Sequence, residues 1–186
     1  MKKLIVFAIA ALATIGASAQ QMGKVNFNEL VMLMPEMDAA RETMTASQKE
    51  AEETYSAMAE EFQNKYTQYQ QKQATWTAAI REAKERELTD INQRLQEFQQ
   101  TISQELQQQQ AQLMAPINEK AQKAVAELAK AKGILVLFDA SQALYFDEEK
   151  VIDLTAEARK VLGIAEGRTL EALQAELQAQ AQQQAQ

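Results

Sequence analysis

The protein has 186 residues and a formal net charge of −7, and its sequence contains no cysteine and no histidine. Disulfides, thiol or imidazole catalysis, and metal sites built from thiolates or imidazoles are therefore excluded. The acidic charge argues against nucleic acid as a partner. The sequence also lacks a glycine-rich loop that could cradle a phosphate, so we expect no cofactor and no enzymatic activity.

Residues 1–19 are typical of a cleaved signal peptide. Lys2 and Lys3 precede an apolar run, Leu4–Ile15, that is shorter than the roughly 20 residues needed to span a bilayer. Ala17-Ser18-Ala19 is the small-x-small pattern that a signal peptidase recognises. The pattern predicts export to the periplasm as a soluble chain starting at Gln20. Loss of the two lysines would change its net charge from −7 to −9.

Residues 20–35 are expected to begin a small body. Gly23–Phe27 is predicted to be a short strand, and Asn28 is predicted to cap a helix that starts at Glu29. Pro35 suits the first turn of the helix that follows.

Residues 36–132 are predicted to form a long antiparallel helical hairpin. They contain no glycine and one proline, Pro116, and consist mainly of strong helix formers. Apolar residues alternate at steps of four and three, which is the pattern of a coiled-coil seam. The residues of this pattern are Met44, Ala51, Tyr55, Met58, Phe62, Tyr69 and Trp76 on one arm, and Leu88, Ile91, Leu95, Phe98 and Ile102 on the other.

The turn of the hairpin is predicted near residues 74–78, which carry no charge and separate the two seams. Pro35 lies 41 residues before Trp76, and Pro116 lies 40 residues after it. A hairpin folded at Trp76 brings the two prolines to the same level, whereas one continuous helix in a parallel dimer leaves that match unexplained. Pro116 is expected to be a hinge in the return arm.

Residues 133–163 are expected to complete the body. Gly133 ends the return helix, and the apolar run Ile134–Phe138 predicts a strand buried on both faces. Ala143–Phe146 and Val151–Ile152 are predicted to be further strands, and a short helix then ends at Gly163.

Residues 164–186 form an Ala/Gln-rich tail that is predicted to be disordered, with a transient helix over 169–177.

The predicted fold is therefore α+β and mainly α, with a hairpin inserted in a small body of β-strands. A body of about 45–50 residues without a disulfide or metal is usually too small to build a sufficient core. Oligomerisation in a closed cyclic assembly is the remaining remedy. The residues expected in the oligomer core are Val25, Phe27, Leu135, Leu137 and Tyr145.

The segment Leu135–Leu162 (LVLFDASQALYFDEEKVIDLTAEARKVL), with the VNF strand, the signal peptide and the charged helical insertion, resembles the Skp/OmpH family of periplasmic chaperones. The resemblance covers about residues 24–163. Four positions fall where the family has Asp, Tyr and Asp-x-Thr: Asp139, Tyr145, Asp153 and Thr155. The resemblance implies a homotrimer whose strands form a central β-barrel and whose hairpins enclose a cavity. Unfolded outer-membrane β-barrel proteins would be held there without a nucleotide.

The charge of this chain departs from the family, whose well-known members are strongly basic. Residues 36–62 carry eight acids and two bases, whereas residues 63–94 carry four acids and six bases. We therefore expect client contact, and weak membrane-surface contact, toward the hairpin tip. The client-binding candidates are Tyr66, Tyr69, Lys72, Trp76, Arg81 and Lys84, although the aromatic series can equally serve as packing between the arms.

Two alternative functions stay open at this stage. One is a structural coiled-coil tether of the cell envelope, and the other is an adaptor at a lipid or peptidoglycan surface. The body segment favours the chaperone over both.

Overall fold

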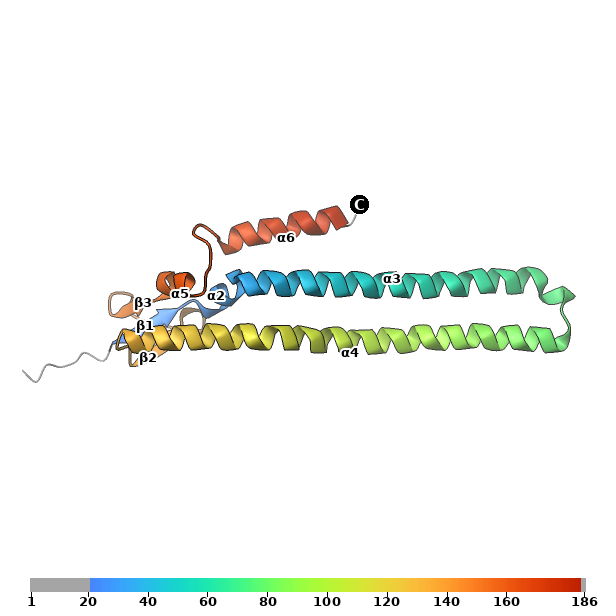
Figure 1. The fold of residues 1–186 in the computed structure, drawn as a ribbon, viewed down its shortest axis with the longest axis horizontal. Coiled ribbons are helices and arrows are strands. Elements are labelled where there is room, and N and C mark those ends of the chain that lie inside the picture. The colour runs from blue at the N-terminus through green and yellow to red at the C-terminus, as the bar shows by residue number, and fades with distance from the viewer. Residues whose placement is uncertain (1–20, 185–186) are drawn as a thin grey trace, which may run out of the picture. The chain divides into compact units, whose positions relative to one another are not determined.

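The computed structural model describes residues 21–184, and the predicted signal peptide lies outside these residues. The chain divides into two compact units, a body that runs up to Pro35 and resumes at Asn118, and a hairpin, Glu36–Ile117. The elements in chain order are β1 (Met22–Val25), α2 (Phe27–Leu33), α3 (Pro35–Lys72), the 3₁₀ turn η1 (Gln73–Thr75), α4 (Ala78–Ala131), β2 (Val136–Asp139), the 3₁₀ turn η2 (Ala140–Gln142), β3 (Val151–Asp153), α5 (Thr155–Val161) and α6 (Leu170–Gln184) (Figure 1).

The body is organised around a three-stranded parallel sheet with the order β2-β1-β3. The first strand is thus the central one, and both of its partners come from the far end of the chain. Lys24 lies opposite Phe138 on one side and Asp153 on the other. Parallel neighbours need a crossover connection, and here the crossover from β1 to β2 contains the whole hairpin.

One face of the sheet is covered by other parts of the body, and the other face is open. Gly23 and Val25 point to the face that the body covers, and both are buried. A Cβ atom at Gly23 would lie 3.1 Å from side-chain atoms of Ile134 and Leu137, so a larger residue there would require these two side chains to shift. The body core consists of Val25, Leu30, Val31, Leu33, Met34, Ala121, Val125, Ala129, Leu154, Ala158, Leu162, Ile164 and Leu173.

Helix α2 begins two residues earlier than the sequence predicts, and Asn26 rather than Asn28 is its N-cap. The Asn26 side chain accepts a hydrogen bond from the Glu29 backbone N–H at 3.3 Å and donates one to the Glu29 carboxylate at 3.1 Å. Asn26 is therefore tied to Glu29 by two side-chain contacts, and Thr155 rather than Glu29 accepts its backbone N–H, so Asn26 takes the cap position in place of Asn28. The backbone N–H of Asn26 also donates to Thr155 Oγ1 at 3.1 Å, which ties the start of α2 to α5.

We predict that Asn26→Ala lowers the free energy of unfolding by about 1 kcal/mol, because an N-terminal N–H of α2 loses its acceptor. Asn28→Ala is the matched control, since the Asn28 side chain contacts only Met32 Sδ at 3.7 Å on the surface. Urea unfolding followed by circular dichroism measures both. Equal losses for the two variants would contradict the assignment of Asn26 as the cap.

Three predictions for the body are corrected by the structure. The strand expected over Ile134–Phe138 starts at Val136, and it is not buried on both faces, because Leu135 is 63% exposed and Val136 is 46% exposed. The strand expected over Ala143–Phe146 does not form. Instead, the Phe146 ring packs edge-to-face on Phe138, with ring centres 5.4 Å apart, so an aromatic contact replaces strand pairing.

The predicted disorder of the tail is also corrected, because residues 170–184 form helix α6. The Thr169 hydroxyl accepts a hydrogen bond from the Ala172 backbone N–H at 3.1 Å, and Leu173 is buried in the body. Ala and Gln are helix formers as well as low-complexity residues, so one buried leucine and one capping threonine suffice to order the segment.

The hairpin consists of α3 and α4, which run antiparallel on either side of a turn made by η1, Trp76 and Thr77 (Figure 1). Helix α4 continues through Pro116 as one element. Pro35 and Pro116 both fall within two residues of the boundaries between the two units. The hinge at Pro116 stays a prediction.

Candidate functional site

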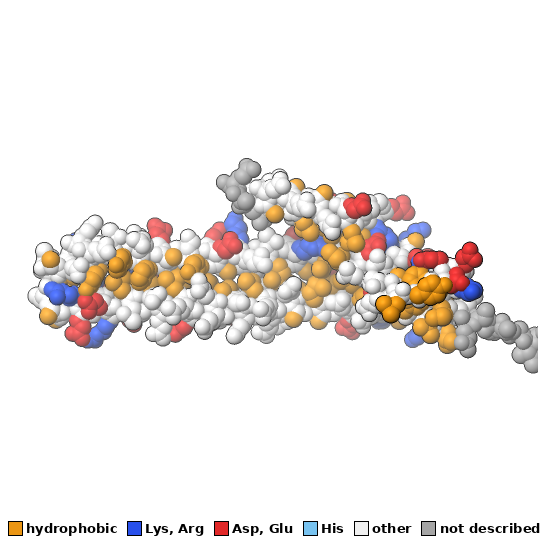
Figure 2. All heavy atoms as spheres, turned by 180° about the vertical axis from the view of Figure 1, so that it is seen from behind, with side chains coloured by type: hydrophobic (Ala, Val, Ile, Leu, Met, Phe, Trp, Pro, Cys, Tyr) orange, Lys and Arg blue, Asp and Glu red, His pale blue; other side chains and the backbone are white. Residues whose placement is uncertain are grey.

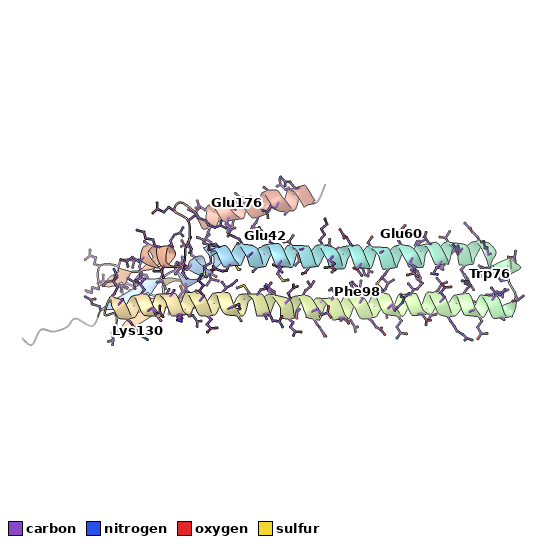
Figure 3. The ribbon with its side chains drawn as sticks, viewed as in Figure 1. Glu42, Glu60, Trp76, Phe98, Lys130 and Glu176 are labelled. Atoms are coloured by element: carbon purple, nitrogen blue, oxygen red, sulfur yellow. The ribbon has the colours of Figure 1, made fainter. Side chains whose placement is uncertain are left out.

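The seam of the hairpin is made by the residues that the heptad pattern singles out. Met44, Ala51, Met58, Phe62 and Tyr69 on α3, and Leu88, Leu95, Phe98 and Ile102 on α4, are all half-buried. Ile91 alone among the twelve patterned residues is fully buried, with 1% exposure. Figure 2 shows the hydrophobic side chains as a band along the hairpin, and Figure 3 shows Phe98 on the side of α4 that faces α3. Two helices bury only one stripe each, so most of the hairpin surface stays in water.

The tip of the hairpin combines aromatic packing with exposed apolar and basic groups. Tyr69 and Trp76 pack edge-to-face with ring centres 5.9 Å apart, and Tyr66 stacks on Phe62 at 6.0 Å. Tyr66 stays 40% exposed, and Ile80, in the first turn of α4, is 45% exposed. Among the described residues, neither Lys72 nor Arg81 forms an ion pair. The tip is therefore the most accessible place for an apolar or acidic ligand to touch the hairpin.

Lys84, the last of the client-binding candidates, is not free, because it belongs to a charged cluster that joins the two arms. Glu87 on α4 accepts hydrogen bonds from Lys65 on α3 and from Lys84 at 2.8 Å. Glu61 lies 3.9 Å from Lys65 and 3.8 Å from Arg94. The hydrogen bonds from Lys65 and Lys84 lower the pKa of Glu87 to about 2, and the bond to Glu87 raises the pKa of Lys65 above its usual 10.5.

We predict that this cluster stabilises the tip between two pH limits. The folded-state pKa of Glu87 lies below its unfolded value of 4.5, so its contribution is present above pH 4.5 and is lost as the pH falls toward 2. The folded-state pKa of Lys65 is raised, so its contribution is lost as the pH rises beyond 10.5. Trp76, the sole tryptophan, reports thermal melting of the tip by fluorescence.

Glu87→Gln should lower the melting temperature at pH 7, and this difference should disappear near pH 2. Glu82→Gln is the matched control, because Glu82 pairs only with Arg86 on the same helix. An Arg86–Glu82 pair of this exposed kind contributes roughly 0.3–0.5 kcal/mol. A pH-independent effect of Glu87→Gln would contradict the assignment.

Midway along the hairpin the seam is incompletely filled. Ala51 occupies the position that methionine holds one heptad before and one heptad after, and its small side chain leaves a hollow of about 470 Å³. We call this hollow the Ala51 groove. Its walls are Tyr55 on α3 and Phe98, Ile102 and Leu106 on α4, with Gln48, Glu52 and Gln99 at the rim. A smaller hollow of about 290 Å³ lies on the other flank of the seam, where Gln109 donates a hydrogen bond to Ser47 at 3.0 Å.

The second face of the body sheet is open and apolar. Met22, Val136, Phe138, Tyr145, Phe146 and Val151 line a hollow of about 730 Å³ on it. Of the residues predicted for an oligomer core, Leu135 (63%) and Tyr145 (86%) are exposed, while Val25 is buried and Phe27 and Leu137 are half-buried. Val25 and Leu137 share the covered face, so they belong to the core of the single chain.

Lys24 is the one charged residue of the central strand, and it is well compensated. Its ammonium lies 4.7 Å from the centre of the Phe146 ring and bonds to Glu148. Asp153 lies 3.6 Å away. The hydrogen bond to Glu148 raises the pKa of Lys24 above its usual value. These contacts hold the 143–150 loop beside the open face.

The family model for OmpH-like outer membrane proteins matches residues 21–162. The chain belongs to the OmpH-like family. No curated protein matches the chain at a significant level. The match spans β1, the whole hairpin and α5, and it ends before α6.

Members of the OmpH-like family are periplasmic chaperones that bind outer-membrane proteins, and the family is not one of enzymes. Within residues 21–184, no group of acidic side chains is arranged to hold a metal ion. No helix in that same range is long and apolar enough to cross a membrane. In an OmpH-like protein, the surfaces to consider are therefore the hairpin and the open face of the body.

Two features of this OmpH-like hairpin were missed by the analysis of the sequence. The contact between Lys65 and Glu87 was available as a signal, because each lies 11 residues from Trp76 in opposite directions. The Ala51 groove gave a weaker signal, since alanine is an ordinary seam residue and its effect depends on what faces it across the hairpin.

Proposed function

We propose that the protein is an ATP-independent holding chaperone that binds unfolded outer-membrane β-barrel proteins in the periplasm and prevents their aggregation. The observation that carries the proposal is the family match over residues 21–162, which includes both the body strands and the hairpin. The signal peptide predicted over residues 1–19 agrees with this compartment.

The shape of the hairpin suits holding rather than folding. Its helices are 38 and 54 residues long, and their buried stripe is used up by packing against each other. The remaining surface is polar and exposes few apolar side chains that a client could contact. A client is therefore bound by many weak contacts. Such contacts add up through effective concentration when several arms surround one client. Enclosure keeps unpaired strands of one client from pairing with those of another.

We also propose that the body forms a homo-oligomer, and that it is a trimer as the family resemblance implies. The sheet has two unprotected edges, β2 and β3, and one open apolar face. A short sheet with exposed edges and residues such as Leu135 and Tyr145 in water is an aggregation hazard unless another chain covers it. Copies of the same chain are the simplest cover, and a closed ring leaves no edge unpaired.

We predict that Leu135→Asp dissociates the oligomer without unfolding the single chain. Leu135 is exposed in the chain alone, so an aspartate costs little there, but burial of that charge in an interface would cost several kcal/mol. Leu177→Asp on α6 is the matched control, because Leu177 is exposed and belongs to α6, whereas Leu135 directly precedes the edge strand β2. Multi-angle light scattering gives the mass. A wild-type monomer, or a Leu135→Asp protein that keeps the wild-type mass, would refute the proposed interface.

The uneven charge of the hairpin determines how salt should act on client binding. Residues 36–62 have a net charge of −6, and residues 63–94 have a net charge of +2. Attraction of acidic client segments is therefore confined to the tip, where Lys72 and Arg81 are exposed. Exposed charges are screened within about 8–10 Å at ordinary ionic strength, so salt should weaken client binding only mildly.

The experiment that tests the function is dilution of a urea-unfolded outer-membrane β-barrel protein into buffer with and without the purified protein. Turbidity and sedimentation measure aggregation at low and at high salt. We expect suppression without ATP and a shallow salt dependence. If several-fold excess of the protein leaves aggregation unchanged, the proposal fails, and a structural tether of the envelope becomes the better account.

A further inference from the structure

We propose that the Ala51 groove binds one aromatic or large aliphatic side chain of a non-native polypeptide, and that it selects a residue with lysine or arginine beside it. This inference rests on the proposed function, since it names the kind of client segment that the middle of the arm recognises. It assigns a role to a part of the hairpin that lies away from the tip.

The size and lining of the groove fit a single apolar side chain. Its volume is about 470 Å³, and its walls are the rings of Tyr55 and Phe98 and the branched side chains of Ile102 and Leu106. Pockets for small ligands start at about 300 Å³, and a phenylalanine or tyrosine side chain buries roughly 150–250 Å².

The groove lies where a small seam residue, Ala51, faces the large side chains of Phe98, Ile102 and Leu106. One turn before Ala51, Ser47 accepts a hydrogen bond from Gln109, which joins the two arms beside the groove. Ile102 and Leu106 line the groove opposite Ala51 and do not fill it. Both stay half-buried, so part of their apolar surface is available to a ligand.

The charge of the hairpin at the level of the groove is negative, with Glu52 at the rim of the groove and Glu50 and Glu105 at the smaller hollow on the other flank. The facing stretches 47–58 and 96–109 contain five acids, Glu50, Glu52, Glu53, Glu97 and Glu105, and one base, Lys49. Lys49 already lies 3.8 Å from Glu53. Glu52 stands at the rim of the groove, and among the described residues it forms no ion pair. A lysine or arginine next to the bound side chain is attracted by these carboxylates, whereas an aspartate or glutamate in that place is repelled by them.

The test is a titration of the purified protein, labelled with ¹³C at its isoleucine methyl groups, with short peptides that differ only at their centres. Ile102 lines the groove and Ile80 lies exposed at the tip, so the two methyl signals separate the two sites. We expect a peptide with Lys-Phe-Lys at its centre to shift Ile102 and to leave Ile80 unchanged. Peptides with Glu-Phe-Glu or Lys-Ser-Lys should leave Ile102 unchanged.

Two variants and one control establish the site. Ala51→Leu fills the groove and should weaken the Lys-Phe-Lys peptide by roughly tenfold or more, because the aromatic side chain loses its place of burial. Glu52→Gln leaves the groove open and should weaken it by roughly two- to fivefold, as expected for one exposed charge pair. Ala57→Leu adds the same volume at an exposed position of α3 and should change nothing.

Several outcomes would overturn the inference. They are equal binding of the Lys-Phe-Lys and Glu-Phe-Glu peptides, a shift at Ile80 in place of Ile102, and full binding to Ala51→Leu with its circular dichroism intact. The aggregation assay run in parallel separates this inference from the proposed function. If the protein suppresses aggregation but the Ile102 signal does not shift, the groove proposal is wrong and the chaperone function stands. If the Ile102 signal shifts but aggregation is not suppressed, the chaperone function is wrong and the groove proposal stands.

Discussion

The pairing of β1 between β2 and β3 is the interaction on which the structure depends. Four residues near the start of the described chain hydrogen-bond to segments that begin more than 110 positions later. This pairing turns a long helical sequence into a closed loop, with residues 36–117 as the insertion. The Asn26 backbone N–H reinforces the closure by donating to Thr155, and Arg159 does so through its 2.8 Å contact with Glu29. All three contacts join the two ends of the family match.

The body is open on one side of its sheet. Helix α5 contacts β1, and Gly23 and Val25 on the covered face are buried, whereas the other face carries the hollow lined by Val136, Phe138 and Phe146. Lys24 lies on that open face. It is a charged residue on a central strand, and its charge is balanced by Glu148 and Asp153 while Phe146 lies beneath its ammonium. The face therefore mixes exposed apolar groups with charged residues that include two ion-paired lysines, Lys24 and Lys150.

The hairpin and its turn could be predicted from the sequence because they depend on periodicity and on the absence of glycine. Ten of the twelve predicted seam residues are half-buried and Ile91 is fully buried, whereas Tyr55 is exposed. The body was harder to predict, because its contacts are non-local. Nothing near Phe146 in the sequence indicates that its ring packs on Phe138 rather than pairing in a strand. Likewise, α6 is ordered by the burial of Leu173, which a composition of Ala and Gln does not reveal. The charged cluster lies between these cases, since Lys65 and Glu87 meet only once the turn is fixed at Trp76.

The central position of β1 also sets the order in which the molecule can form. During synthesis β1 leaves the ribosome first, but both of its partners are made last, and β3 is complete only at Asp153. The contacts within the hairpin join residues that are closer in sequence, such as Lys65 and Glu87, which are 22 residues apart. Helices α3 and α4 can therefore pack against each other, starting at the tip, before the sheet forms. Until residue 139 is made, β1 has no strand partner, and its second partner is complete only at Asp153. The whole sheet can therefore form only after the entire hairpin has been synthesised.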